Sequence, residues 1–213
     1  MSLIFQKFKD KKAYKIFYKN KFFVASIFFV ILQLLILYKY TYLSGFSNML
    51  WFCSHASMIL AIGFFFKNFN LIKAIISVGL IIQFFWFLDF LSNLVFGFFI
   101  FGATDYMFLD TSLFSYIISL FEHLTCLIAL LLTYKIKTER KVLIYAFIYL
   151  IILLIVTILF SGEGSNYNFV RNLLIFNELT FSGYQFFWIF SAMTFIVLPV
   201  YFFQIWLYNL HKS

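Results

Sequence analysis

A glutamate and a histidine stand side by side in the middle of a strongly apolar run. The run 112–133 is about long enough to cross a hydrocarbon core of roughly 30 Å, and Glu122 and His123 lie near its centre. An acidic or basic group at that depth costs roughly 2.5–3.5 kcal/mol on insertion scales, so such residues are rare unless they pair or take part in function. Together they could move protons, either as an acid–base pair in catalysis or as a relay.

The same run carries a polar stripe. Ser115, Ser119, Glu122 and Cys126 are spaced by four, three and four residues, so they share one helix face, and His123 borders it. In lipid, such a face turns toward the interior of a helical bundle. The stripe fits either a packing seam of small residues joined by a buried acid–imidazole pair, or part of a functional site.

A second cluster lies in the segment WFCSHAS, residues 51–57. His55 is expected to be an interfacial histidine that hydrogen-bonds the outer loop. A buried cysteine such as Cys53 is ordinarily an inert small hydrophobe, but it becomes a nucleophile if a base takes its proton. His123 is the candidate base, because helical rise places Cys53 about 12 Å and His123 about 16 Å from the outer ends of their helices.

The elements that position these residues are predicted to be membrane-spanning helices. Apolar residues make up 64% of the 213-residue chain, far above the level of a soluble domain. We predict an all-α fold: a polytopic membrane helical bundle, in which 1–213 is a single integral membrane domain and 1–21 is a basic cytoplasmic segment. Six spans are expected, at roughly 22–38, 45–66, 71–89, 112–134, 142–160 and 184–208.

The distribution of basic residues predicts the orientation. With both termini in the cytoplasm, fourteen of the 16 lysines and arginines lie on the inner side, and only Lys39 and Arg171 fall outside. The net charge of +8 is thereby explained by topology and contact with anionic lipid headgroups, and no nucleic-acid motif accompanies it. We predict a multi-pass protein of the cell membrane, the cytoplasmic membrane of a bacterium.

Two irregular features are expected. The segment 91–110 is too apolar for an ordinary loop and too interrupted by glycine for a further span, so we predict a re-entrant or interfacial piece capped by Asp105. Pro199 is expected to kink the last helix, because it removes the hydrogen bond to the carbonyl of Phe195.

The two cysteines, Cys53 and Cys126, lie in separate apolar segments without CxxC spacing or surrounding ligands. This spacing disfavours a zinc site and a thioredoxin-like redox pair, although a disulfide between the two helices stays open. We predict no metal and no cofactor.

The motifs MLWFCSHASMILA and SLFEHLTCLIALLL, with one span and a loop between them, resemble those of the YwaF-type bacterial integral membrane proteins. Those proteins are grouped with the androgen-induced membrane fatty-ester hydrolases and a membrane acyltransferase. The resemblance covers roughly 49–134. It implies a six-helix protein that acts on fatty-acyl esters, with Cys53 at the nucleophile position and His123 at the histidine position.

On the acyl-transfer hypothesis, His123 deprotonates Cys53 and later protonates the leaving group. Asp89 or Asp105 would orient the imidazole or bind a headgroup, and an acyl-lipid substrate would enter from the outer leaflet. An oxyanion donor is also required, and the candidates are Asn93, Ser57 and backbone amides of 91–110.

Two other classes of function remain open. A small-solute or proton carrier would use Glu122, His123 and Asp89 as a proton relay. A non-catalytic membrane subunit would use the same polar residues to stabilise helix packing or to bind a partner. In each case the partners include membrane lipids.

Overall fold

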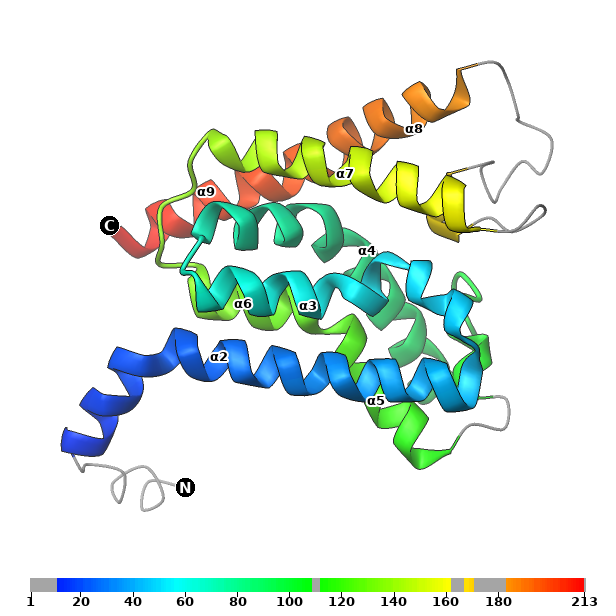
Figure 1. Cartoon of the computed structure of the whole chain (residues 1–213), viewed down its shortest axis with the longest axis horizontal. Helices are drawn as coiled ribbons and strands as arrows, with labels where there is room; N and C mark the ends of the chain where they lie inside the picture. The colour runs from blue at the N-terminus through cyan, green and yellow to red at the C-terminus, as the bar shows by residue number, and fades with distance from the viewer. Residues whose placement is uncertain (1–10, 109–111, 162–166, 171–182, 213) are drawn as a thin grey trace.

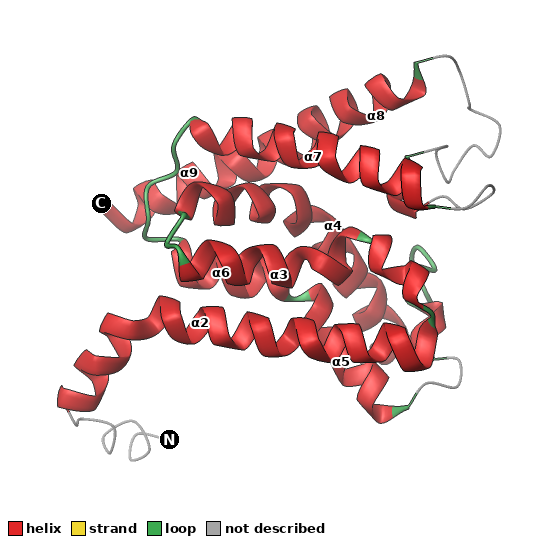
Figure 2. Cartoon of the chain, in the orientation of Figure 1, coloured by secondary structure: helices red, strands yellow, loops and turns green. Residues whose placement is uncertain are grey.

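The computed structural model describes residues 11–108, 112–161, 167–170 and 183–212. In this part of the chain all regular structure is helical, and no strand occurs (Figure 2), which confirms the all-α prediction. The α-helices are α2 (Lys11–Lys39), α3 (Phe52–Phe65), α4 (Phe69–Phe96), α5 (Leu113–His123), α6 (Thr125–Thr133), α7 (Lys141–Phe160), α8 (Tyr184–Ser191) and α9 (Leu198–Lys212).

The helices lie side by side in one bundle, and the start of α2 and the end of α9 are at the same end of it (Figure 1). Four helical stretches are long and apolar enough to span a membrane: 20–43, 69–96, 141–160 and 184–212. The pair α5–α6 makes a fifth if its 43° bend lies within one span. The six predicted spans are therefore confirmed for four, or for five with the bent pair.

The predicted span 45–66 is shorter than expected. Gly45 has φ +93°, residues 46–50 form a 3-10 turn, and α3 begins only at Phe52. A distant asparagine holds this start: Asn168 Oδ1 accepts from Phe52 N at 2.9 Å, and Asn168 Nδ2 donates to Leu50 O at 2.7 Å. Because α3 has 14 residues, it rises only about 21 Å.

Helix α4 is the central element of the bundle. It packs against α3, α6, α7 and α9, and it is the most buried of the candidate spans. Close packing is possible at Gly79, where an added Cβ would overlap the Phe52 ring and the Sγ of Cys126. Large apolar side chains elsewhere point outward, for example Leu34 on α2 and Ile144 on α7, as expected for surfaces that meet lipid. By helix length and hydropathy, the chain is a multi-pass membrane protein.

The two predicted irregularities have different outcomes. A π-helical turn, Ala192–Val197, immediately precedes Leu198 and Pro199, and 184–212 runs on as one candidate span, so the kink at Pro199 stays a prediction. The segment 91–110 divides instead: residues up to Phe96 continue α4, and Gly97, at φ +75°, ends the helix. The rest of the described segment is a loop with a 3-10 turn at 105–107.

Candidate functional site

A buried ion pair lies at the centre of the candidate site. Lys39 Nζ is 3.1 Å from Glu122 Oε2, and the two side chains are only 4% and 1% exposed. Lys39 is the last residue of α2, and Glu122 is the next-to-last residue of α5. Two charges removed from water cost several kcal/mol each, so a pair at this depth persists only where further hydrogen bonds complete it.

Three neutral side chains supply those hydrogen bonds. Tyr40 donates to both oxygens of Glu122, at 3.0 and 3.1 Å, and Ser54 donates to Oε1 at 2.7 Å. Lys39 in turn donates to Ser119 Oγ at 2.6 Å and to the hydroxyl oxygen of Tyr40 at 3.2 Å. We call these five residues the polar cluster. It joins the end of α2 to α3 and α5.

The polar cluster lies next to a break in a helix. The chain bends between α5 and α6, and the hydrogen bond from Cys126 N to Glu122 O, which a continuous helix would make, is replaced by a side chain of α4. Gln83 Oε1 accepts from Cys126 N at 2.9 Å, while its Nε2 donates to Thr125 Oγ1 at 2.8 Å and, at 3.4 Å, to Glu122 O. Gln83 thus satisfies the backbone groups that the bend releases.

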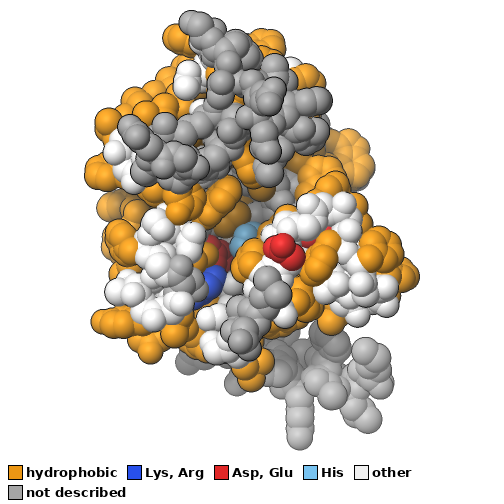
Figure 3. All heavy atoms as spheres, turned by 90° about the vertical axis from the view of Figure 1, so that its right-hand side faces the viewer, with side chains coloured by type: hydrophobic (Ala, Val, Ile, Leu, Met, Phe, Trp, Pro, Cys, Tyr) orange, Lys and Arg blue, Asp and Glu red, His pale blue; other side chains and the backbone are white. Residues whose placement is uncertain are grey.

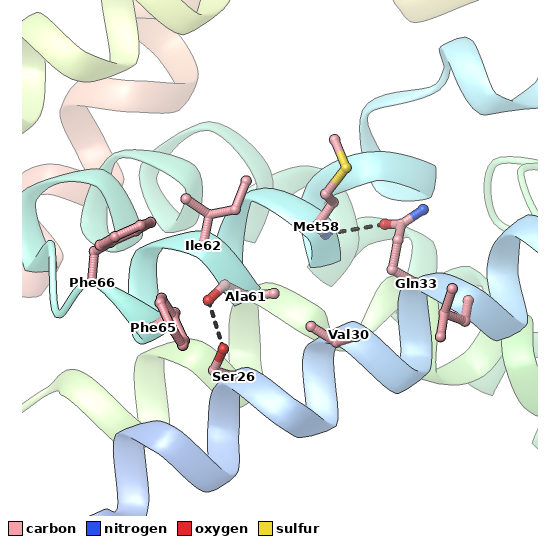
Figure 4. A pocket seen from close by; sticks show the side chains of 9 residues that line it. Ser26, Val30, Gln33, Met58, Ala61, Ile62, Phe65 and Phe66 are labelled. Carbon is pink, nitrogen blue, oxygen red and sulfur yellow. Dashed lines mark hydrogen bonds between the residues drawn. The ribbon is translucent and has the colours of Figure 1, made fainter.

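A second glutamine makes the same kind of contact with α3. Gln33 Nε2 donates to Ser54 O at 3.1 Å, and Gln33 Oε1 accepts from Met58 N at 3.0 Å, so one side chain contacts both ends of a four-residue helical step. Figure 4 shows the hydrogen bond between Gln33 and Met58 beside an apolar groove between α2 and α3. Ser57 also donates to Gln33 Oε1, at 2.6 Å, so its hydroxyl proton is used in that contact.

His123 borders the polar cluster in a defined orientation. Its Nδ1 lies 2.8 Å from Ser119 O, so Nδ1 carries the proton in that contact and Nε2 is left as an acceptor. The ring stacks on Trp86, with centroids 3.8 Å apart and planes 8° apart. The Nε1–H of Trp86 is buried, and it has no hydrogen-bond partner among the residues that the structure describes.

The surface above the site is hollowed. Seen from the end of the bundle at which α4 ends, Figure 3 shows basic, acidic and histidine side chains together at the bottom of a depression. Lys39, Tyr40 and Glu122 are buried, whereas His123 is half-buried. The polar groups therefore lie below one end of the bundle and not at its lipid-facing sides.

Among the residues that the structure describes, no hydrogen bond joins Cys53 and His123, the predicted dyad. Cys53 is buried beside Gln83, whereas His123 contacts Ser119 and Trp86. The dyad therefore stays a prediction. Both cysteines are free, so no disulfide joins α3 to α6.

The predicted acids have separate roles. Asp89 is fully buried, and its carboxylate accepts from Phe101 N at 2.7 Å and from the backbone and hydroxyl of Thr104 at 2.9 Å each. It therefore holds the loop after α4, and the capping role expected of Asp105 stays a prediction. Asp105 is exposed and accepts only from the neighbouring Tyr106 N among the described contacts.

The remaining predicted residues have local partners. His55 Nδ1 lies 3.2 Å from Met49 O in the preceding turn, and its Nε2 lies 2.7 Å from the hydroxyl of Tyr149. Asn93 accepts through its backbone carbonyl from Gly97 N, which is a helix-end contact. Among the described residues, no three His, Cys, Asp or Glu side chains gather as a metal site would require.

Sequence reasoning missed Lys39, Gln33 and Gln83. Lys39 did leave a signal, because it was one of two basic residues on the wrong side of the predicted charge distribution. A basic residue near the outer end of a span is explained when an acid on another helix pairs with it. The glutamines left a weaker signal, since an amide inside a span is polar without being charged.

Comparison with models of known protein families found no match, and neither curated proteins nor solved structures gave one. The fold and the site therefore define a class only: a multi-pass integral membrane protein with a buried polar cluster below one end of its bundle.

Proposed function

We propose that this protein is a small carrier of the cytoplasmic membrane, that the polar cluster binds a proton, and that Trp86 and His123 beside it bind a small polar solute. One observation carries the proposal: the buried ion pair of Lys39 and Glu122 lies at the break between α5 and α6. Ionisable residues inside a membrane are costly and commonly mark ion or substrate pathways. Carriers commonly build their binding sites where a spanning helix is interrupted.

The surroundings of the ion pair support solute binding. The buried Nε1–H of Trp86 lies beside the Tyr106 hydroxyl and makes no hydrogen bond of normal length among the described residues, and the half-buried ring of His123 stacks on the same indole. A small solute with an acceptor oxygen could satisfy Trp86, and one with a donor could bind Nε2 of His123. A solute would approach from the end of the bundle at which Figure 3 shows a surface hollow.

The proton step follows from the hydrogen bonds of Glu122. Protonation of Glu122 would remove the negative charge of its carboxylate, so that Lys39 loses its counter-ion. The attraction that holds the end of α2 to α5 would then weaken. Release of that proton on the other side restores the carboxylate and the ion pair, and no other reactant is consumed.

The orientation rests on charge. Lysines and arginines gather at the end of the bundle where α2 starts and α9 finishes, which is the cytoplasmic side under the positive-inside rule. The polar cluster then opens to the outer side. In this orientation the solute site would face the external medium, as an uptake or export carrier requires.

The test is proton and solute flux in proteoliposomes that hold the full chain. A panel of small polar solutes is applied under an imposed pH gradient, and internal pH is followed with a dye. We expect solute-dependent proton flux in the wild type, loss of that flux in Glu122→Gln, and near-normal flux in the matched variant Asp105→Asn, an acid at the same end that is exposed. Flux that survives Glu122→Gln would refute the role of the ion pair.

A second candidate is the intramembrane acyl-ester hydrolase or acyltransferase. The observation that favours it is that Cys53 is buried beside Gln83, whose amide also contacts the carbonyl of Glu122, the residue before His123. It requires Cys53 to react with acyl-thiol probes and to react less when His123 is alanine. The carrier proposal requires Cys53→Ser to leave flux intact, so the two candidates give opposite results with that variant.

A further inference from the structure

Three buried polar atoms near the N-terminal end of α4 have no hydrogen-bond partner among the described residues. They are Lys73 Nζ, Gln204 Oε1 and Thr138 Oγ1. Lys73 and Gln204 are fully buried, and Thr138 is 6% exposed. A buried polar group without a partner is rare in proteins, so each one calls for an explanation.

Other contacts bring these residues to the same part of the bundle. Gln204, on α9, donates from Nε2 to Lys73 O at 3.2 Å and to Ser77 Oγ at 2.8 Å. Asn70, one turn before Lys73 on the same face of α4, donates to Glu139 Oε2 at 3.2 Å. That contact anchors the loop that carries Thr138 to the first turn of α4.

The charge around Lys73 indicates what kind of ligand this site would bind. Lys73 lies in the second turn of α4, near the positive end of the helix dipole, and no acid lies in the first turn. A buried ammonium without a counter-ion is strongly unfavourable. Exposed basic side chains occur in the connections at this end of the bundle, at positions 67, 135, 137, 140 and 141, and Glu139 is the acid that contacts Asn70. An anion would balance this charge, whereas a cation or neutral ligand would not.

We propose that Lys73, Thr138 and Gln204 bind a phosphate group at the cytoplasmic end of α4, either in the headgroup of an acidic phospholipid of the inner leaflet or as inorganic phosphate. Phosphate oxygens accept hydrogen bonds from the Lys73 ammonium and the Thr138 hydroxyl. Gln204 Oε1 accepts from a hydroxyl, such as that of a glycerol headgroup or of a protonated phosphate. Basic pockets between helices on the cytoplasmic side are a known mode of lipid recognition. This site is independent of the proposed carrier function.

The experiment measures thermal unfolding of the full chain in detergent, with additions of phosphatidylglycerol, phosphatidylcholine or sodium phosphate. In the wild type, we expect phosphatidylglycerol to raise the melting temperature and phosphatidylcholine, the control for acyl chains, to have a smaller effect. In Lys73→Met the apparent affinity for phosphatidylglycerol should fall at least about tenfold, since truncating one side of a buried charge pair mainly speeds dissociation. Lys137→Met, an exposed lysine at the same end, should respond as the wild type does.

The three additions separate the two sources of phosphate. A rise with sodium phosphate alone that Lys73→Met abolishes supports the site and assigns it to the free anion. Three results would overturn the proposal. The melting temperature of Lys73→Met could rise as much as that of the wild type, the two lipids could raise it equally, or no addition could change it. Native mass spectrometry of the wild type keeps the test valid if Lys73→Met does not fold: co-purified acidic phospholipid or phosphate supports the site, and a bare chain that binds neither on titration refutes it.

Discussion

Replacing Lys39 by methionine should destabilise the protein strongly. Methionine keeps most of the apolar stem and removes the charge, so Glu122 loses its cation and keeps only the hydroxyls of Tyr40 and Ser54 as donors. The carboxylate is 1% exposed, so water does not replace the missing partner. Breaking a buried ion pair from one side costs roughly 3–5 kcal/mol. We expect a loss near the lower end, about 3 kcal/mol, because the two hydroxyls still stabilise the carboxylate.

The measurement is the free energy of unfolding in mixed detergent micelles, for four chains: wild type, Lys39→Met, Glu122→Gln and the double variant. The double variant removes both charges, so its loss should be smaller than the sum of the single losses, with a coupling energy of at least about 1 kcal/mol. Lys137→Met is the control, since the same substitution at an exposed site should change stability by less than about 0.5 kcal/mol.

Two results would refute this reasoning. A loss below about 1 kcal/mol for Lys39→Met would mean that the pair behaves like an exposed salt bridge and that water reaches Glu122. Additive losses in the double variant would mean that the two side chains do not interact in solution, despite their separation of 3.1 Å in the structure.

Three further variants test how the bundle is held together. Gly79→Ala should destabilise the protein by roughly 1–3 kcal/mol in thermal unfolding, because the added Cβ would overlap the Phe52 ring and Cys126 Sγ. Unchanged stability would mean that these two side chains can shift to make room. Gln83→Leu should cost about 1–3 kcal/mol and speed hydrogen exchange at the Cys126 amide, and unchanged exchange there would contradict the contact. Asn168→Ala should cost about 1–2 kcal/mol and increase exchange at Phe52, the first residue of α3, and protection that persists would show another partner.

The sequence predicted the fold class well because long apolar runs leave few alternatives in a membrane. Backbone groups in lipid must be satisfied within the segment, so an apolar run of that length is helical. The same reasoning misplaced the start of α3, since an asparagine more than one hundred residues away determines it. It also missed the bend after His123, because Gln83 of another helix is what makes that bend tolerable.

The sequence predicted one member of the buried ion pair, Glu122, and missed the other, Lys39. Glu122 was found because a charge in an apolar run is conspicuous, and its partner was overlooked because Lys39 lies near the expected end of its span. Asp89 was an equally plausible member of a relay, yet its carboxylate is occupied by the loop after α4. Residue type shows which groups are costly in a membrane, whereas only the packing shows which other groups offset that cost.

The two glutamine contacts connect the ion pair to the backbone of two helices. Ser54 donates its hydroxyl to Glu122, while its carbonyl accepts from Gln33. The carbonyl of Glu122 faces Gln83, which also binds the first amide beyond the bend. Any event that neutralises Glu122 thus acts on a residue whose main chain forms one side of the bend between α5 and α6. Loss of the ion pair would also release the end of α2. A local change of charge at Glu122 can therefore alter the packing of three helices, α2, α5 and α6.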